Sequence, residues 1–204
     1  MVTLWWRSLL IGFAIAAPVG PIGLLCIQRT LQRGRTVGLI SGLGAATADA
    51  FYGMVAGFGI TLIANFLLGQ QLWLGLVGGL FLCYLGLRTW QTPPATVAAS
   101  LQFGGLWQAY GSTLVLTLTN PMTIFSFMAI FAGMGLATQS TDYSGALVVV
   151  LGVFCGSAAW WLLLSGGVAL VRDRLSASVL GWINRGAGVV LFGFGLFLLV
   201  TLWR

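Results

Sequence analysis

The amino-acid sequence predicts an all-α integral membrane protein with six transmembrane helices, arranged as two inverted three-helix repeats. Of its 204 residues, 59% are hydrophobic and 6% are charged, whereas about a quarter of the residues in a soluble domain are charged. The mean hydropathy is +1.02, and the apolar residues form runs long enough to cross a bilayer, about 20 residues each. This composition excludes disordered chains, nucleic-acid-binding modules and most soluble enzymes.

Six apolar segments are expected to span the membrane, and short connections separate them. They lie at residues 4–28, 37–64, 71–91, 106–136, 145–171 and 178–203. Pro93 and Pro94 end the third segment, because proline cannot continue a helix. The chain is therefore expected to form one transmembrane domain over residues 1–204, with pseudo-repeats at 1–91 and 106–204.

The first segment has some features of a secretory signal peptide. It follows Arg7, and Ala14 and Ala16 resemble a small-residue cleavage site. Hydrophobicity resumes at once through residues 22–27, however, so we interpret the segment as a retained first span.

The arginines lie mostly in the connections on one side of the predicted bundle. Seven are expected there: Arg29, Arg33, Arg35, Arg88, Arg172, Arg174 and Arg185. Only Arg7 and Arg204, at the termini, fall on the other side. By the positive-inside rule, both termini are expected outside the cytoplasm.

Breaks are expected in the first and fourth spans. Pro18, Gly20 and Pro21 interrupt the first, and Asn120 and Pro121 interrupt the fourth. Proline frees a backbone carbonyl, which a membrane tolerates only where the helix is buried in protein or lines a cavity. The backbone N–H groups exposed at such a break could hold a carboxylate; the alternative is a simple packing kink.

The two breaks also suggest an internal repeat. Halves with three spans each must lie upside down relative to one another. Pro21 and Pro121 are 100 residues apart, and LCYLGL at 82–87 in the third span parallels LFGFGL at 191–196 in the sixth. Together these matches favour an inverted repeat.

Asp49 is the most informative single residue, because a carboxylate near the middle of a span costs about 2.5–3.5 kcal/mol on insertion scales. It shares a helix face with small residues: Gly38, Gly42, Ala45, Ala46, Gly53, Ala56 and Gly57. This face is expected to pack inward. Asp49 could bind an ammonium group or exchange a proton; the alternative is a protonated structural aspartate that bonds a neighbouring helix.

Other polar and small residues have less specific interpretations. Asn120 could contact a ligand or satisfy the carbonyls freed by Pro121. Gly152 and Gly156 predict close helix packing. Tryptophans at span ends predict an aromatic belt, whereas Trp160 and Trp161 lie deeper, and the sequence indicates no role for them.

The residue types that are missing limit the chemistry further. The chain has no Lys, Glu or His, so a histidine-assisted nucleophile and a histidine metal site are excluded. Cys26, Cys83 and Cys155 are isolated and are expected to be dispensable packing residues. We expect no catalytic residue, no metal site and no cofactor.

Several stretches together resemble the LysE/RhtB-type amino-acid exporters of bacterial inner membranes. They are APVGPIG at 17–23, RTLQRGR at 29–35, GLISGLGAATAD at 38–49, GGLFLCYLG at 78–86, and Asn120 with Pro121. The resemblance covers essentially the whole chain and is most specific over residues 12–90. Many members carry lysine after the Asn-Pro pair, where this chain has Met122.

The resemblance implies a secondary transporter that exports an amino acid or a related zwitterion or cation, driven by protons or the membrane potential. It places Asp49, Pro18, Gly20, Pro21, Asn120 and Pro121 along the path. The replacement of lysine by Met122 leaves basic, neutral and non-amino-acid substrates open. The expected partners are the substrate, a coupling proton and lipid, without nucleic acid, and the sequence also allows a homo-oligomer.

Two alternatives to amino-acid export have a related topology, a membrane thiol-redox carrier and an exporter of cations or heavy metals. A membrane thiol-redox carrier would need cysteines that can approach each other, whereas the three here fall in the first, third and fifth spans. A heavy-metal exporter would need clustered cysteine, histidine or acidic ligands. The sequence supplies neither arrangement.

Overall fold

The computed structural model describes residues 1–18, 20–58, 69–91, 105–120, 123–124, 126–127, 143–172 and 177–202. Within these residues every regular element is a helix, and no strand occurs. The helices are α1 (Val2–Ala16), α2 (Pro21–Arg33), α3 (Arg35–Gly57), α5 (Gln71–Gln91), α6 (Leu106–Leu118), α8 (Tyr143–Arg172) and α9 (Ala177–Thr201). The predicted all-helical class is thus confirmed.

Three described helices are long and apolar enough to cross a membrane, at Leu72–Gln91, Tyr143–Arg172 and Ser178–Thr201. They match the predicted third, fifth and sixth spans. The pair α1 and α2 makes a fourth if it is one span, bent by 78° at its break. The six-span arrangement stays a prediction, because parts of the second and fourth segments, and Pro93 and Pro94 between the halves, lie outside the described residues.

The connection between the first two predicted spans differs from the expected arginine-rich loop. Helix α2 continues to Arg33, and Gly34 alone separates it from α3, which begins at Arg35. Gly34 has a φ of 93°, a left-handed conformation that glycine adopts without a Cβ penalty. The prediction that Arg29, Arg33 and Arg35 lie in a loop is therefore wrong: Arg29 lies inside α2, Arg33 ends this helix and Arg35 begins α3.

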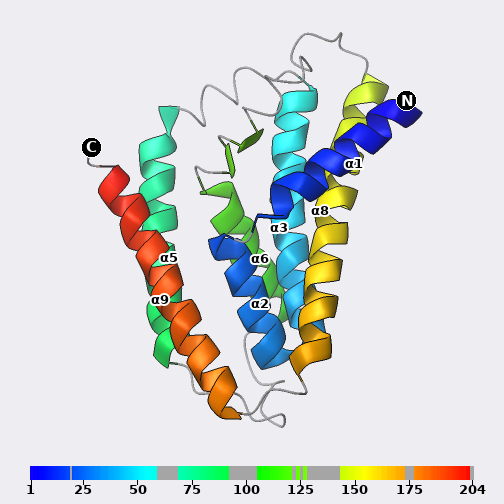
Figure 1. The fold of residues 1–204 in the computed structure, drawn as a ribbon. Coiled ribbons are helices and arrows are strands. Elements are labelled where there is room, and N and C mark those ends of the chain that lie inside the picture. The colour runs from blue at the N-terminus through cyan, green and yellow to red at the C-terminus, as the bar shows by residue number, and fades with distance from the viewer. Residues whose placement is uncertain are drawn as a thin grey trace.

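The helices pack in two groups that meet at α2 (Figure 1). In the first group α8 packs on α1 and α3, and α3 also packs on α6. In the second, α5 packs along α9 at the other side of the bundle. Helix α2 contacts α3, α8 and α9, so the chain break before α2 lies between the two groups.

Glycines allow the closest helix approaches, as the sequence predicts. A Cβ added to Gly156 would lie 1.9 Å from the Leu9 carbonyl oxygen, and one added to Gly12 would lie 2.1 Å from the Val153 oxygen. The expected close packing of the fifth span is therefore confirmed, with α1 as the partner. The small-residue face of α3 packs inward as well, since Ala45 and Ala46 are buried.

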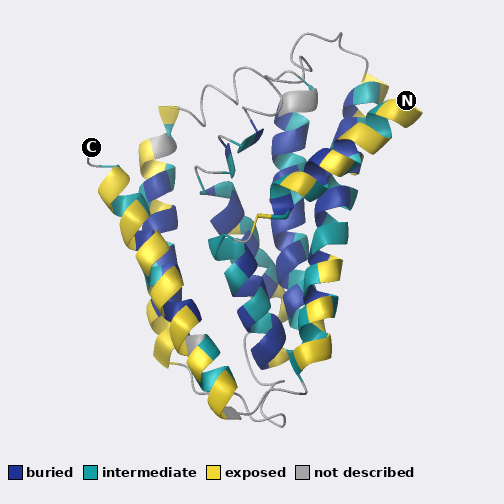
Figure 2. Ribbon diagram, in the orientation of Figure 1, coloured by how far each residue is buried: buried dark blue, intermediate teal, exposed yellow. Residues whose placement is uncertain are grey.

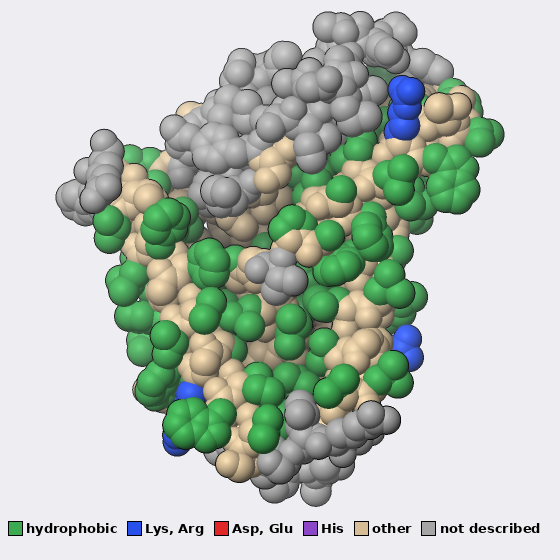
Figure 3. All heavy atoms as spheres, viewed as in Figure 1, with side chains coloured by type: hydrophobic (Ala, Val, Ile, Leu, Met, Phe, Trp, Pro, Cys, Tyr) green, Lys and Arg blue, Asp and Glu red, His purple; other side chains and the backbone are tan. Residues whose placement is uncertain are grey.

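Burial decreases from the centre of the bundle outward. Figure 2 shows buried residues concentrated on α2, α3 and α6, and exposed residues on the outer sides of α5 and α9. On the face drawn in Figure 3, hydrophobic side chains cover most of the described surface and a few arginines appear toward its ends. An apolar exterior of this kind suits a lipid environment.

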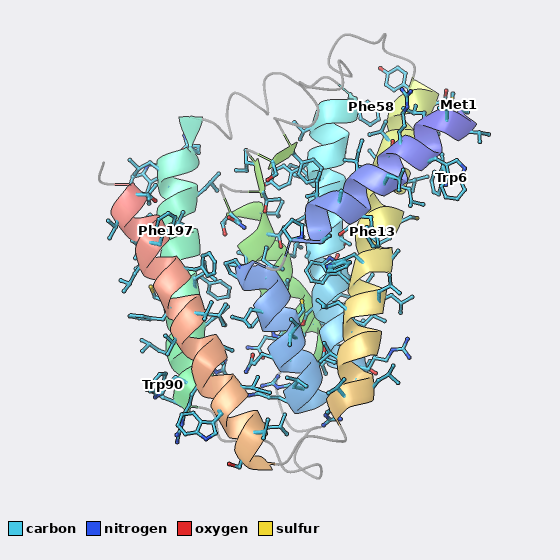
Figure 4. All side chains as sticks on the ribbon, viewed as in Figure 1. Met1, Trp6, Phe13, Phe58, Trp90 and Phe197 are labelled. Carbon is cyan, nitrogen blue, oxygen red and sulfur yellow. The ribbon has the colours of Figure 1, made fainter. Side chains whose placement is uncertain are left out.

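Two exposed tryptophans fit the predicted aromatic belt. Trp6 and Trp90 lie toward opposite ends of the bundle (Figure 4), and each exposes more than half of its surface. Tryptophan prefers the boundary between lipid and water, where its ring is apolar and its N–H can be hydrated.

Candidate functional site

The first chain break lies between α1 and α2, where Pro18, Gly20 and Pro21 predict it. Pro21 is the first residue of α2, a position where its missing N–H costs no helix bond. Gly20 is extended, with φ of −95° and ψ of −161°, and no side chain caps the helix. The N–H groups of the first turn have no carbonyl partner within the helix, so Ile22 and Gly23 present donors there.

The second break begins where α6 ends, at Leu118. The Thr119 N–H still donates to the Val115 carbonyl, and the Thr123 N–H donates to the Asn120 carbonyl at 3.0 Å. From α3, the Tyr52 hydroxyl donates to the Leu118 carbonyl at 2.6 Å. The chain thus leaves the helix at Asn120, while Pro121 itself lies outside the described residues.

Both breaks face one cavity of about 800 Å³. Five of the six residues that the sequence singled out line it: Pro18, Gly20, Pro21, Asp49 and Asn120. They come from the break before α2 and its first residue, from the middle of α3 and from the segment after α6, so positions up to 102 residues apart in the chain meet at one space. Apolar side chains of α5 and α9 complete the wall.

Asp49 is held by a short chain of hydrogen bonds from α8. The Ser157 hydroxyl donates to its Oδ2 at 2.7 Å, and the Trp161 Nε1–H donates to the Ser157 oxygen at 3.1 Å. Asp49 and Trp161 are each 3% exposed. Among the described residues no cationic side chain bonds this carboxylate, which leaves it able to take a proton or a substrate cation.

Sequence reasoning missed three residues of this site, namely Ser157, Trp161 and Tyr52. The sequence indicates no role for Trp161, yet this residue lines the cavity. It also packs on the backbone of Gly42, because a Cβ added to Gly42 would lie 2.4 Å from the Cβ of Trp161. The available signals were spacings: Tyr52 follows Asp49 by three residues, and Trp161 follows Ser157 by four. Such spacings put each pair on one helix face, but they do not reveal the contact between helices.

Arg29 is the centre of a hydrogen-bond cluster outside the cavity lining. Its Nη1 donates to Ser41 at 2.9 Å, to the Ala109 carbonyl at 2.9 Å and to Thr113 at 2.8 Å. Its Nη2 donates to Ser112 at 2.7 Å. One side chain on α2 therefore joins α3 and α6.

The acceptors around Arg29 are neutral and already oriented. The hydroxyl of Ser41 donates to the Val37 carbonyl, and the hydroxyls of Ser112 and Thr113 both donate to the Ala109 carbonyl. Their lone pairs are thus left for the guanidinium, whose planar fork can meet several acceptors at once. We interpret the cluster as a structural tie between three helices.

Residues 13–202 match the sequence model of the family described as LysE type translocator. The chain belongs to this family. The matched range contains Asp49 and both chain breaks, so the resemblance that the motifs suggested is confirmed.

Several relatives resemble this chain over nearly its whole length. A putative amino acid efflux protein of Bacillus subtilis, YcgF, is 27% identical over 93% of this chain and 91% of its own. The threonine efflux protein of Escherichia coli K12 is 24% identical over 92% of this chain and 93% of its own. The chemotactic transduction protein ChpE of Pseudomonas aeruginosa is 25% identical over 95% and 96%. No solved structure gives a significant match.

Membership in the LysE family makes this chain a membrane translocator. Neither of the other functions weighed from the sequence, thiol-redox transfer and heavy-metal export, is favoured by this family. Within the described residues, no group of three or more Cys, Asp, Glu or His side chains could hold a metal ion, and Cys26, Cys83 and Cys155 are free thiols.

Proposed function

We propose that this protein exports amino acids across the bacterial inner membrane as a secondary-active transporter that works by alternating access. One observation carries the proposal: in a member of the LysE family, Asp49 and both chain breaks line the same cavity. Transporters bind substrates at broken helices near mid-membrane, where helix ends supply partial charges. The names of the efflux relatives support amino acids as the substrate class.

The cavity offers a partner for each charged group of an amino acid. The Asp49 carboxylate can accept hydrogen bonds from the α-ammonium. The N–H groups of Ile22 and Gly23 lie at the start of α2, which carries a partial positive charge, and they suit the α-carboxylate. Asn120 lines the same cavity, and its amide can donate and accept hydrogen bonds.

The same carboxylate is the candidate for proton coupling. A charged Asp49 without a cationic partner is costly inside a membrane, and either a proton or a substrate ammonium removes that cost. If the two compete for Asp49, a proton that enters on one side displaces the amino acid on that side. Export against a gradient then follows from alternation between the two sides.

Helix packing supports the inverted repeat over residues 1–91 and 106–204. If the halves are equivalent, α1 corresponds to α6, α3 to α8, and α5 to α9. A two-fold axis then relates the contact of α1 with α8 to that of α6 with α3, and both contacts occur. It also requires equivalent helices to pack on each other, as α3 does with α8 and α5 with α9.

Glycine contacts between α5 and α9 support the same symmetry. A Cβ on Gly86 would meet the Gly188 carbonyl oxygen, and one on Gly188 would meet the Gly86 oxygen, each at 2.8 Å. Gly79 and Gly195 approach in the same reciprocal manner. The offset of 109 residues that aligns LCYLGL with LFGFGL also aligns Gly79 with Gly188 and Gly86 with Gly195. The two-fold axis therefore exchanges the Gly86–Gly188 contact with the Gly79–Gly195 contact.

For orientation we propose that both termini lie outside the cytoplasm. Helix α1 begins and α9 ends at the same end of the bundle in Figure 1, and α2, α5 and α8 end at the other. Each of these three helices carries an arginine in its last turn, namely Arg33, Arg88 and Arg172. An end rich in arginine favours the cytoplasmic side.

Transport in proteoliposomes tests the proposed function. Vesicles that contain the purified protein would be loaded with radiolabelled amino acids, and release would be followed with and without a pH gradient. We expect at least one amino acid to leave faster than from protein-free vesicles, and the gradient to accelerate its release. Release of none of the twenty amino acids, under either condition, would contradict the proposal.

A further inference from the structure

We propose that the exported amino acid carries a bulky, uncharged, apolar side chain, of the size of leucine, methionine or phenylalanine. This inference rests on the proposed amino-acid export and concerns the part of the cavity that Asp49 and the chain breaks do not occupy. The sequence leaves basic, neutral and non-amino-acid substrates open, and this inference selects the neutral amino acids.

The cavity has a polar part and an apolar part. The polar groups come from α2, α3, α6 and the residues after the second break, among them Asn120, Thr123 and Ser126, and the ammonium and carboxylate are expected to bind there. The other wall, from α5 and α9, is apolar: Leu72, Leu82, Phe194, Phe197, Leu198 and Leu202. Leu72, Phe194 and Phe197 are also exposed at the surface, so this wall includes the edge of the cavity. Figure 4 labels Phe197 on α9. The side chain of a bound amino acid, directed away from the polar part, would therefore meet aliphatic and aromatic surface.

The Thr201 hydroxyl, the one described hydroxyl on the wall from α5 and α9, leaves this wall without a free hydrogen-bond donor. Thr201 lies on α9 and lines the cavity, but its hydroxyl donates to the Leu198 carbonyl of its own helix at 2.8 Å. Thr117, on the polar side, is committed in the same way to the Thr113 carbonyl. A polar substrate side chain would thus lose water at the apolar wall and find few new partners there.

Charge excludes the acidic and basic amino acids. Asp49 is the one charged residue among the described cavity lining, and the α-ammonium of any amino acid neutralises it. A second ammonium or a guanidinium would then face no acid, and a second carboxylate would face no base. Arg29 is not part of the lining, and its Nη1 and Nη2 donate to four acceptors outside the cavity.

Size favours a large side chain over a small one. About 800 Å³ is ample for a ligand of this kind, since pockets for small molecules range from about 300 to 1,000 Å³. Each methylene removed from water strengthens binding by a factor of about four. Leucine has three more carbons than alanine, so a preference of at least tenfold is expected even if the wall covers the side chain only in part.

The decisive experiment compares apparent KM values in counterflow, with the full-length protein in liposomes. Leucine and phenylalanine should give values at least tenfold lower than alanine and threonine, and lysine and glutamate should not be transported. Threonine is the critical comparison, because one relative is named for its efflux. If threonine or alanine binds as well as leucine, the side-chain inference is overturned and amino-acid export stands. If no amino acid is transported, both fail.

Two matched variants on α9 test whether the apolar wall selects the side chain. Leu198 lines the cavity, whereas Leu196 is exposed and is not part of the lining. Leu198→Ser should raise the KM for leucine about fivefold or more and leave that for alanine within twofold. Leu196→Ser, the same change on the outer face, should alter neither. Equal effects of Leu198→Ser on leucine and alanine would also overturn the inference.

Discussion

Asp49→Asn should reduce pH-driven net export at least tenfold without unfolding the protein. The amide keeps the shape of the carboxyl group, and its oxygen can still accept the hydrogen bond that Ser157 donates at 2.7 Å. What it loses is the negative charge and the titratable proton. Because the buried charge is itself unfavourable, the variant should insert and fold at least as well as the wild type.

Two transport assays on Asp49→Asn distinguish the two roles of this carboxylate. If Asp49 carries the proton, exchange of labelled for unlabelled substrate at equal pH should survive while net export is lost. If it binds the ammonium, exchange and net export should weaken together, because affinity is lost. Activity like that of the wild type in both assays would leave Asp49 with a purely structural role.

Arg29→Lys should lower the stability of the folded protein in detergent by about 2 kcal/mol, or roughly 4–8 °C in melting temperature. Lysine keeps the charge on α2 but has a single nitrogen, whereas the guanidinium uses two to reach Ser112, Thr113, Ser41 and the Ala109 carbonyl. Some of these acceptors therefore lose their donor, and the ties from α2 to α3 and α6 weaken.

Arg33→Lys is the matched control for this prediction. Arg33 lies four residues further along the same helix and is exposed, so its replacement should leave the melting temperature within about 1 °C, as surface changes usually do. Thermal unfolding followed by tryptophan fluorescence measures both variants. Equal melting temperatures for Arg29→Lys and Arg33→Lys would show that the cluster does not stabilise the bundle.

The parts of the site that follow from local covalent chemistry could be predicted from sequence. Proline lacks an N–H and fixes its φ, so Pro18 and Pro21 indicated the break before α2 without knowledge of any neighbour. Helical periodicity put Asp49 on the small-residue face of α3, and that face is buried. In both cases the signal lies within one segment of chain.

The parts that depend on contacts between helices could not be predicted. Serine and threonine in a helix usually bond their own backbone, as Ser41, Thr113 and Thr117 do here. Nothing in the sequence marks Ser157 as the hydroxyl that bonds Asp49, 108 residues away.

The prediction that the arginines between the first two spans lie in a loop was wrong for a related reason. A basic run between apolar segments is typical of a cytoplasmic loop, but Arg33 ends α2 and Arg35 begins α3, and both are exposed there. Arg29 instead turns into the bundle, because hydroxyls of α3 and α6 lie opposite it. A single sequence does not show which helix will supply such acceptors.

Substrate protection of a cysteine in the cavity tests the central claim most directly. Cys26, Cys83 and Cys155 are expected to be dispensable, so their alanine variant provides a background. Thr123→Cys would then place a thiol in the cavity lining, and Ser144→Cys would place one on the exposed start of α8. The account predicts that the transported amino acid slows methanethiosulfonate labelling at position 123 at least threefold and leaves position 144 unchanged. Labelling of position 123 at the same rate with and without saturating substrate would contradict it.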